Sequence, residues 1–291
     1  RSAPSSTPSD MNVLAHGEVV DHTSDVLAFH PHWDVYLLIA VLAVGYYAGM
    51  PRLAARFAPQ GEVAVTTRQK WLFGIGLVAW LVVSTWPFHD IAEKSLFTFH
   101  MIEHMTLAWV VPPLLLMGSP WWLTRVLVRP IMGPLRFATK PLIALVAFNA
   151  VLAAIHAPRA VELMVTNDAF HFGAHLVLMA TAFLLWWPVL GPIPDFPKLS
   201  SMAAIGYLFA NGLVPTIPAS FLTFATDSVY PVYNGFPRLW GLDVITDQTI
   251  AGLVMKIGGG LLLWGVMIVI YFRWWQEEQR FSPSRPERVP T

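Results

Sequence analysis

Long apolar runs separated by short polar segments dominate the chain from residue 33 onwards. A membrane hydrocarbon core of roughly 30 Å needs about 20 helical residues to cross it. The pattern predicts an all-α, polytopic membrane protein with seven transmembrane helices. The first, second and fourth runs are short, so a six-span alternative with one interfacial segment stays open. The expected spans lie near 33–49, 70–86, 95–117, 142–156, 172–190, 202–224 and 249–272.

Positive charge is distributed unevenly between the two sets of loops that these spans define. Thirteen Lys and Arg residues fall in loops 1–2, 3–4 and 5–6 and in the C-terminal segment, whereas four fall on the other side. Because cytoplasmic loops carry the excess of Lys and Arg, we expect the N-terminus outside and the C-terminus in the cytoplasm. The expected organisation is an exposed, partly disordered tail (1–30), a membrane domain (31–275) and a cytoplasmic tail (276–291).

Composition narrows the chemistry that the chain can perform. Hydrophobic residues make up 55% of the sequence and charged residues 12%, with a formal net charge of zero. A neutral chain offers no basic field for nucleic acid, so no nucleic-acid partner is expected. There are no cysteines, which removes disulfides and thiolate metal sites and leaves His, Met, Asp and Glu as metal ligands.

The ten histidines all fall in segments expected outside or in the outer halves of spans. His100 and His104 form one H-x-x-x-H pair, and His171 and His175 form another. Residues four apart lie on one face of a helix, so each pair can present two imidazoles to one ion. His156 ends the fourth span at the same expected depth. Hydrogen-bonded packing is the alternative role for each histidine, but two pairs at one depth favour a metal site.

Carboxylates and thioethers near these pairs are further candidates. Asp168 precedes His171 by three residues and would orient an imidazole, cap the fifth span or bind metal directly. Glu103 lies within about 60° of the first histidine pair around the helix, as a ligand or a hydrogen-bond partner of one. Three thioethers are weaker candidates as soft ligands for Cu(I): Met101, Met105 and Met255.

Lys256 lies about two turns inside the seventh span, where an unpaired ammonium group is costly. Asp247 and Asp243 lie near the same end of that span. We therefore expect a buried ion pair between Lys256 and one of them, Asp247 being the first choice. A proton or anion pathway is the functional alternative.

Several ordered motifs resemble the CtaG family of membrane-bound cytochrome c oxidase assembly factors, over roughly residues 30 to 275. The resemblance implies a seven-span protein, without enzymatic turnover, in a bacterial inner membrane. The motifs are His-Met-Ile-Glu-His-Met at 100–105, Val-Pro-Pro-Leu-Leu at 111–115, Gly-Ser-Pro at 118–120, His-Ala-Pro at 156–158, the second histidine pair, Trp-Trp-Pro at 186–188, Asp-Gln at 247–248, Ala-Gly at 251–252 and Met-Lys at 255–256.

The resemblance also implies a role as a copper chaperone in the maturation of a haem-copper oxidase. The five histidines His100, His104, His156, His171 and His175 would handle copper, as Cu(I) or Cu(II), on the outer face. The implied partners are oxidase subunits and a soluble copper chaperone, in contact with a lipid bilayer.

Three other functions are weighed against this one. A copper transporter needs polar or soft ligands through the whole membrane, but the inner halves of these spans hold no histidine. A haem-binding electron carrier needs axial ligands on both faces of the haem, which two imidazoles of one i,i+4 pair cannot supply, although one histidine from each pair can. A membrane di-metal oxygenase would bring more carboxylates.

Overall fold

The computed structural model describes residues 26–281, and this part of the chain is all-helical: 80% of the structure is helix, and the described residues contain no strand. The expected all-α class is therefore confirmed. His16, His22, most of the expected N-terminal tail and residues 282–291 lie outside the described residues.

Within residues 26–281, four helices are long and apolar enough to cross a membrane, or up to seven if each bent pair of helices is one span. The three bent pairs correspond to the three short runs of the sequence together with their flanking helices, with bends of 51°, 42° and 90°: Trp33–Tyr47 with Met50–Phe57, Thr67–Val83 with Phe88–Lys94, and Trp121–Ala138 with Pro141–Ile155. The four others are Phe97–Gly118, Asp168–Leu190, Ser201–Phe224 and Val244–Arg280. Seven spans and the orientation of the termini remain predictions.

The centre of the bundle is a row of contacting helices in the order α10, α12, α7, α4. Helix α6 continues into α7 through the π-helical turn η1, so that Phe97–Gly118 forms one continuous helix, here called the α6–α7 rod. The bounds are α4 (Thr67–Val83), α6 (Phe97–Met105), η1 (Thr106–Val110), α7 (Val111–Gly118), α10 (Pro141–Ile155) and α12 (Asp168–Leu190).

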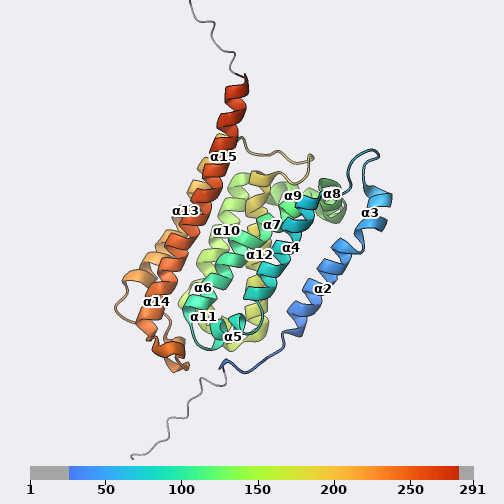
Figure 1. Cartoon of the computed structure of the whole chain (residues 1–291). Helices are drawn as coiled ribbons and strands as arrows, with labels where there is room; N and C mark the ends of the chain where they lie inside the picture. The colour runs from blue at the N-terminus through green and yellow to red at the C-terminus, as the bar shows by residue number, and fades with distance from the viewer. Residues whose placement is uncertain (1–25, 282–291) are drawn as a thin grey trace, which may run out of the picture.

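Further helices flank this row or close its ends (Figure 1). On one flank α2 (Trp33–Tyr47) contacts α4; on the other, α13 (Ser201–Phe224) contacts α14 (Val244–Leu253) and α15 (Gly259–Phe281), which are joined by the π-helical η5 (Val254–Gly258). At the lower end in the view lie α5 (Phe88–Lys94) and α11 (Pro158–Thr166). At the upper end lie α3 (Met50–Phe57), α8 (Trp121–Val128) and α9 (Met132–Ala138). Three 3-10 turns complete the order: η2 (Arg129–Ile131), η3 (Pro231–Gly235) and η4 (Leu239–Gly241).

One stripe of α12 explains how this helix is oriented. Ala174, Leu178, Ala182 and Leu185 are buried and recur every three or four residues, which is the spacing of one helical face. His171 begins the same stripe. Packing of the apolar part against α7 and α10 therefore turns the histidines near the start of α12 towards the bundle interior.

The proline pair of the α6–α7 rod explains its π-helical turn. Pro112 and Pro113 have no N–H, so carbonyl groups one turn earlier lose their usual helical donors. The chain widens into η1 immediately before them. The indole N–H of Trp186 on α12 donates to the freed carbonyl of Ala108 at 3.1 Å. This bond ties the two histidine-bearing helices together below the histidines.

Several helix ends differ from the predicted ones because polar side chains cap them. Helix α12 begins at Asp168 rather than near 172, because Asn167 accepts a hydrogen bond from the backbone N–H of Phe170. Helix α14 begins at Val244 rather than near 249, because Asp243 accepts from the N–H groups of Ile245 and Thr246. Helix α15 continues to Phe281 and so includes the first residues of the expected C-terminal tail.

Candidate metal site

Helix α6, which carries the first histidine pair, is capped by another helix. The side chain of its N-cap residue, Leu96, is apolar and makes no capping hydrogen bond. Instead the buried carboxylate of Asp247 on α14 accepts from the backbone N–H of Phe97 at 2.8 Å and of Thr98 at 2.9 Å. A carboxylate here satisfies two orphan donors and complements the helix dipole. The cap fixes the start of α6, and His100 and His104 follow within two turns.

The five predicted histidines converge between α6, α10 and α12; we call them the histidine cluster. The ring centroids of His100 and His104 are 4.2 Å apart, and those of His171 and His175 are 4.3 Å apart. The two pairs meet where Nε2 of His104 lies 2.9 Å from Nε2 of His175. The ring of His156 lies 6.2 Å from that of His104. Spans 3 and 5 therefore present their histidine faces to each other.

Hydrogen bonds outside the cluster set the tautomers of two of its rings. Nδ1–H of His156 donates to the carbonyl of Leu152 at 2.7 Å. Nδ1–H of His171 is shared between Glu93 Oε1 at 2.8 Å and the carbonyl of Met164 at 3.0 Å. With the proton on Nδ1, Nε2 of each neutral ring carries a lone pair. Metal-binding histidines are usually held in this way, with the second nitrogen bonded to a carbonyl or carboxylate.

Buried nitrogens without partners concentrate in the cluster. Among the described residues, both nitrogens of His100, Nδ1 of His104, and Nε2 of His156 and His171 are buried and have no hydrogen-bond partner. Buried polar atoms are paired in the great majority of cases, so several orphan imidazole nitrogens in one place are unusual. A neutral imidazole has a lone pair on one of its two nitrogens, and such nitrogens are donor atoms that suit a soft or borderline metal ion.

Two carboxylates and one further histidine line the outer side of the cluster. Glu103 is buried, accepts a hydrogen bond from Ser84 at 3.0 Å, and lies 3.8 Å from Nδ1 of His175. Nδ1–H of His89 donates to Glu103 at 2.9 Å, and Nε2 of His89 lies 3.4 Å from Glu93. Burial alone would lower the pKa of His89, but the nearby Glu103 and Glu93 carboxylates raise this pKa to about 11.

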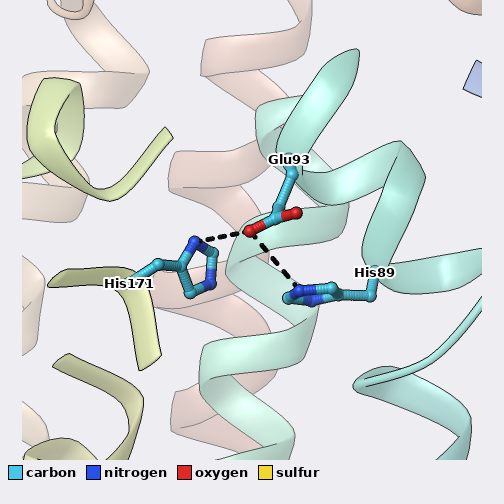
Figure 2. Close-up of side chains that lie close together, drawn as sticks. All are labelled: His89, Glu93 and His171. Atoms are coloured by element: carbon cyan, nitrogen blue, oxygen red, sulfur yellow. Dashed lines mark ion pairs between the residues drawn. The ribbon is translucent and has the colours of Figure 1, made fainter. Parts of the chain in front are cut away.

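Glu93 lies between two imidazoles, one from α5 and one from α12. Figure 2 shows one carboxylate oxygen of Glu93 facing both the ring of His171 and the ring of His89. Ligand atoms of these three residues all lie within 4.8 Å of one another. A cavity of about 430 Å³ is lined by the three residues and by His175, among others. His100, His104 and His156 do not line it in the described part of the chain.

The other predicted ligands lie in less favourable places. Asp168 is exposed at the rim of this cavity, and neither caps α12 nor contacts His171 in the described structure, because Asn167 and Glu93 take those roles. Met101 and Met255 are buried members of the hydrophobic core. The terminal methyl of Met105 packs closely against Gly259, where η5 meets α15; a Cβ at that position would be only 2.6 Å away. Glu103 is the best placed of the additional candidates.

The expected ion pair between Lys256 and Asp247 does not form, and that prediction was wrong. Asp247 pairs with Arg238 at 2.7 Å and caps α6, so its oxygens are already in use. Lys256 lies 5.5 Å from the ring centroid of Phe224 and 3.5 Å from the hydroxyl of Ser220. Asp243, the second choice, caps α14 instead.

Sequence reasoning missed His89 and Glu93 as parts of the site. They form an H-x-x-x-E pair in the short segment between α4 and α6, and that spacing puts both on one face of a single helical turn. The segment is too short and polar to stand out as a helix in the hydropathy pattern. The repeat of an i,i+4 ligand pair, the third in this chain, was the signal that could have identified them.

The arrangement suits a small metal ion better than a haem. Tetrahedral ligand atoms about 2.0 Å from an ion lie about 3.3 Å apart, so small ring movements would open the 2.9 Å contact between His104 and His175 to that spacing. The same contact leaves no room for a porphyrin plane between these two nitrogens. The geometry therefore disfavours haem ligation by this pair.

Comparisons with known proteins agree with the motifs. The sequence model of the family described as cytochrome c oxidase caa3 assembly factor (Caa3_CtaG) matches residues 44–277. The uncharacterized protein Mb0105 of Mycobacterium bovis is 26% identical over 275 residues, covering 85% of this chain and 39% of that protein. The uncharacterized protein ML1998 of Mycobacterium leprae is 24% identical over 294 residues, covering 89% and 42%. The chain thus spans less than half the length of these curated relatives. No solved structure matches it.

Proposed function

Since this chain belongs to the cytochrome c oxidase caa3 assembly factor family, we propose that it handles copper for the maturation of a haem-copper oxidase. The family match confirms the resemblance found in the sequence motifs. In this proposal copper is cargo: the histidine cluster holds it and releases it to a partner. No substrate turnover is involved.

The orphan nitrogens of the histidine cluster are the observation that carries the proposal. A purely structural cluster would be expected to satisfy its buried donors and acceptors, because each unsatisfied group costs about 1–3 kcal/mol. His156 and His171 each have a buried Nε2 without a partner among the described residues, while Nδ1 of each ring is hydrogen-bonded to a backbone carbonyl. A bound ion would complete these rings without disturbing the bonds that position them.

The donor set suits copper. Imidazoles bind Cu(I) and Cu(II), and no cysteine is present to hold the ion more tightly than a delivery role allows. The buried carboxylate of Glu103, 3.8 Å from Nδ1 of His175, would offset the positive charge of the ion. Cluster and carboxylate together therefore form a site from which a partner can remove the ion by ligand exchange.

The same proposal places the cluster at the outer face of a bacterial inner membrane, in a chain of seven spans. The cluster lies at the end of the bundle that carries α5 and α11, away from the arginine-bearing α3, α8 and α9 (Figure 1). Oxidase subunits and a soluble copper chaperone would then meet it from outside. Impermeant reagents should label a tag near Ser5 in intact cells and leave a C-terminal tag unlabelled; labelling of both would refute this topology.

The decisive experiment removes one imidazole from each pair by combining His104→Asn with His175→Asn. Asn keeps polarity and much of the volume but is a poor copper ligand, so the purified variant should fold and retain less copper. In cells, copper per oxidase polypeptide should fall when variant and wild-type levels are matched. Added copper should restore part of it by mass action.

A matched control combines His16→Asn with His22→Asn, the same chemical change outside the cluster, and should leave copper retention unchanged. Copper content of the purified protein, with and without reductant, is measured beside its visible absorption spectrum. Equal copper retention by the cluster variant would refute the proposal, and a stoichiometric haem spectrum would replace it with electron transfer.

A further inference from the structure

Copper bound in the histidine cluster would be sealed from solvent, which raises the question of its route. His100, His104, His156 and His171 are all buried. His175 is less buried and, with His171, lines the 430 Å³ cavity that opens between α2, α5 and α12. An ion from outside therefore meets the cavity residues before it meets the deeper imidazoles.

We propose that His89, Glu93 and His171 form a separate metal-binding station through which copper enters and leaves the histidine cluster. This inference rests on the proposed function. The three residues come from α5 and α12, and their ligand atoms lie within 4.8 Å of one another (Figure 2). We call this set the outer station.

Charge favours the outer station as the first stop for a cation. Glu93 supplies an anionic oxygen that can contact the ion directly. Asp34 and Asp168 also line the cavity, whereas the one lysine there, Lys94, is paired with the buried Asp90 at 2.6 Å. The positive charge of His89 is offset by Glu103, with which it pairs at 2.9 Å. The remaining carboxylates therefore attract a cation, and Glu93 compensates the charge of Cu(I) while it loses its hydration.

His171 is the link between the two sites because it belongs to both. Its Nδ1 lies 2.8 Å from Glu93, and its Nε2 is buried and has no partner among the described residues. Its ring lies 5.8 Å from that of His100, a member of the cluster. From its ring the next imidazole, His175, is 4.3 Å away, and His104 is 4.9 Å beyond that. Successive ligands at such separations allow stepwise exchange without release of a free ion.

Protons balance in this transfer. A metal ion at the outer station takes the place of the proton on Nε2 of His89, which leaves to the cavity. It also takes the place of the proton on Nδ1 of His171, which is exchanged for one on Nε2 of the same ring, so that one proton is released in total. The ring of His171 stays neutral with one proton throughout. It carries that proton on Nε2 while the ion is at Nδ1, and on Nδ1, bonded again to Glu93, once the ion is at Nε2. No electron is transferred.

The test measures the rates of copper uptake and release separately from the equilibrium affinity for copper. It uses the whole chain (residues 1–291) in detergent. Cu(I) is supplied under reductant as its coloured bicinchoninate complex. Loss of the colour measures the rate at which the protein takes up the ion. Return of the colour after excess bicinchoninate is added measures the rate of release. In Glu93→Gln, both rates should fall about tenfold or more, as for other residues that support a metal site. The equilibrium affinity of the cluster should stay within about threefold of wild type, because no cluster ligand changes and the amide oxygen of the replacement and the Met164 carbonyl still accept from Nδ1–H of His171.

Two further variants control this comparison. Glu162→Gln removes an exposed carboxylate of α11 that does not line the cavity, and its rates should equal those of wild type. Glu93→Asp keeps the charge but shortens its reach, so its rates should be intermediate; it carries the test if Glu93→Gln does not fold.

Each outcome has a distinct meaning. Unchanged rates in Glu93→Gln overturn the outer station and leave the proposed function intact. Equal losses of affinity and rate also overturn it, because Glu93 would then belong to the retention site itself. Full copper retention by the His104→Asn, His175→Asn double variant, or no copper binding by wild type, refutes the proposed function and the outer station with it.

Discussion

Two buried polar networks adjoin α6, and they differ in how completely their atoms are paired. At the start of the helix, Asp247 binds Arg238 and two backbone N–H groups, and Arg238 also donates to the carbonyls of Ser95 and Leu242. Within two turns, the histidine cluster has five buried imidazole nitrogens that find no partner among the residues that the structure describes. One network is closed and the other is open, although both are buried at the same end of the bundle.

The difference separates stability from cargo binding. In a closed network, whose polar atoms are all paired, no atom is left to bind a ligand. Removal of one member lowers the free energy of unfolding strongly, because the remaining charge stays buried without a partner. An open network can accept an ion, and some of its members can be removed with little loss of stability, because their polar atoms already lack partners. Substitutions in the two networks should therefore affect folding and copper binding in opposite proportions.

The largest effect on stability is expected for Asp247→Ala. The change removes the carboxylate that pairs with the guanidinium of Arg238 and accepts from the N–H groups at the start of α6. Breaking a buried ion pair from one side costs about 3 kcal/mol or more, so the free energy of unfolding should fall by that amount. Chemical unfolding in detergent measures it. Copper per folded molecule should stay near the wild-type value.

Asp243→Ala is the matched control for this variant, because Asp243 also caps a helix but is exposed. Its unfolding free energy should fall by less than that of Asp247→Ala. If the two variants were equally stable, the buried network would contribute no more than an exposed cap, and the closed-network interpretation would be wrong.

The opposite balance is expected for His100→Leu. Neither nitrogen of His100 has a partner, so an apolar replacement should change the free energy of unfolding by less than about 1 kcal/mol. Copper affinity should nevertheless fall about tenfold or more through loss of a donor. His171→Leu is the contrasting variant, because it also loses the bonds to Glu93 and Met164 and should lower both stability and affinity. A large stability loss in His100→Leu alone would indicate a structural role for that ring.

The apolar pattern predicted the helical class and the positions of most of the long apolar helices, since burial in lipid imposes such helices on any sequence. It did not place the helix ends, because these depend on single caps such as Asn167 and Asp243. It also gave no sign of the bends between α2 and α3 or between α9 and α10, which arise where short apolar runs meet surface helices.

Local spacing predicted which histidines share a helical face, and the convergence of the two pairs followed because both faces continue into buried stripes. The partner of Asp247 was not predictable in the same way. Arg238 lies in the segment between α13 and α14, and only tertiary folding brings it to the start of α6. An acidic partner was predicted for Lys256 because the sequence places it about two turns inside an apolar run, but the structure leaves its side chain partly exposed.

The smallest effect is expected for Lys256→Met, which tests that last point. Lys256 is only partly buried, and its contacts are the ring of Phe224 and a long hydrogen bond to Ser220. A cation–π contact at such a site contributes about 0.5–1 kcal/mol, while removal of an ammonium group from an apolar span is favourable, so the two nearly cancel. The free energy of unfolding should change by less than about 1 kcal/mol, and copper uptake should equal that of wild type. Lys256→Arg keeps the charge and should behave alike. If Lys256→Met abolished oxidase maturation in cells while Lys256→Arg did not, the positive charge itself would be required, and the proton or anion pathway would become the better account of Lys256.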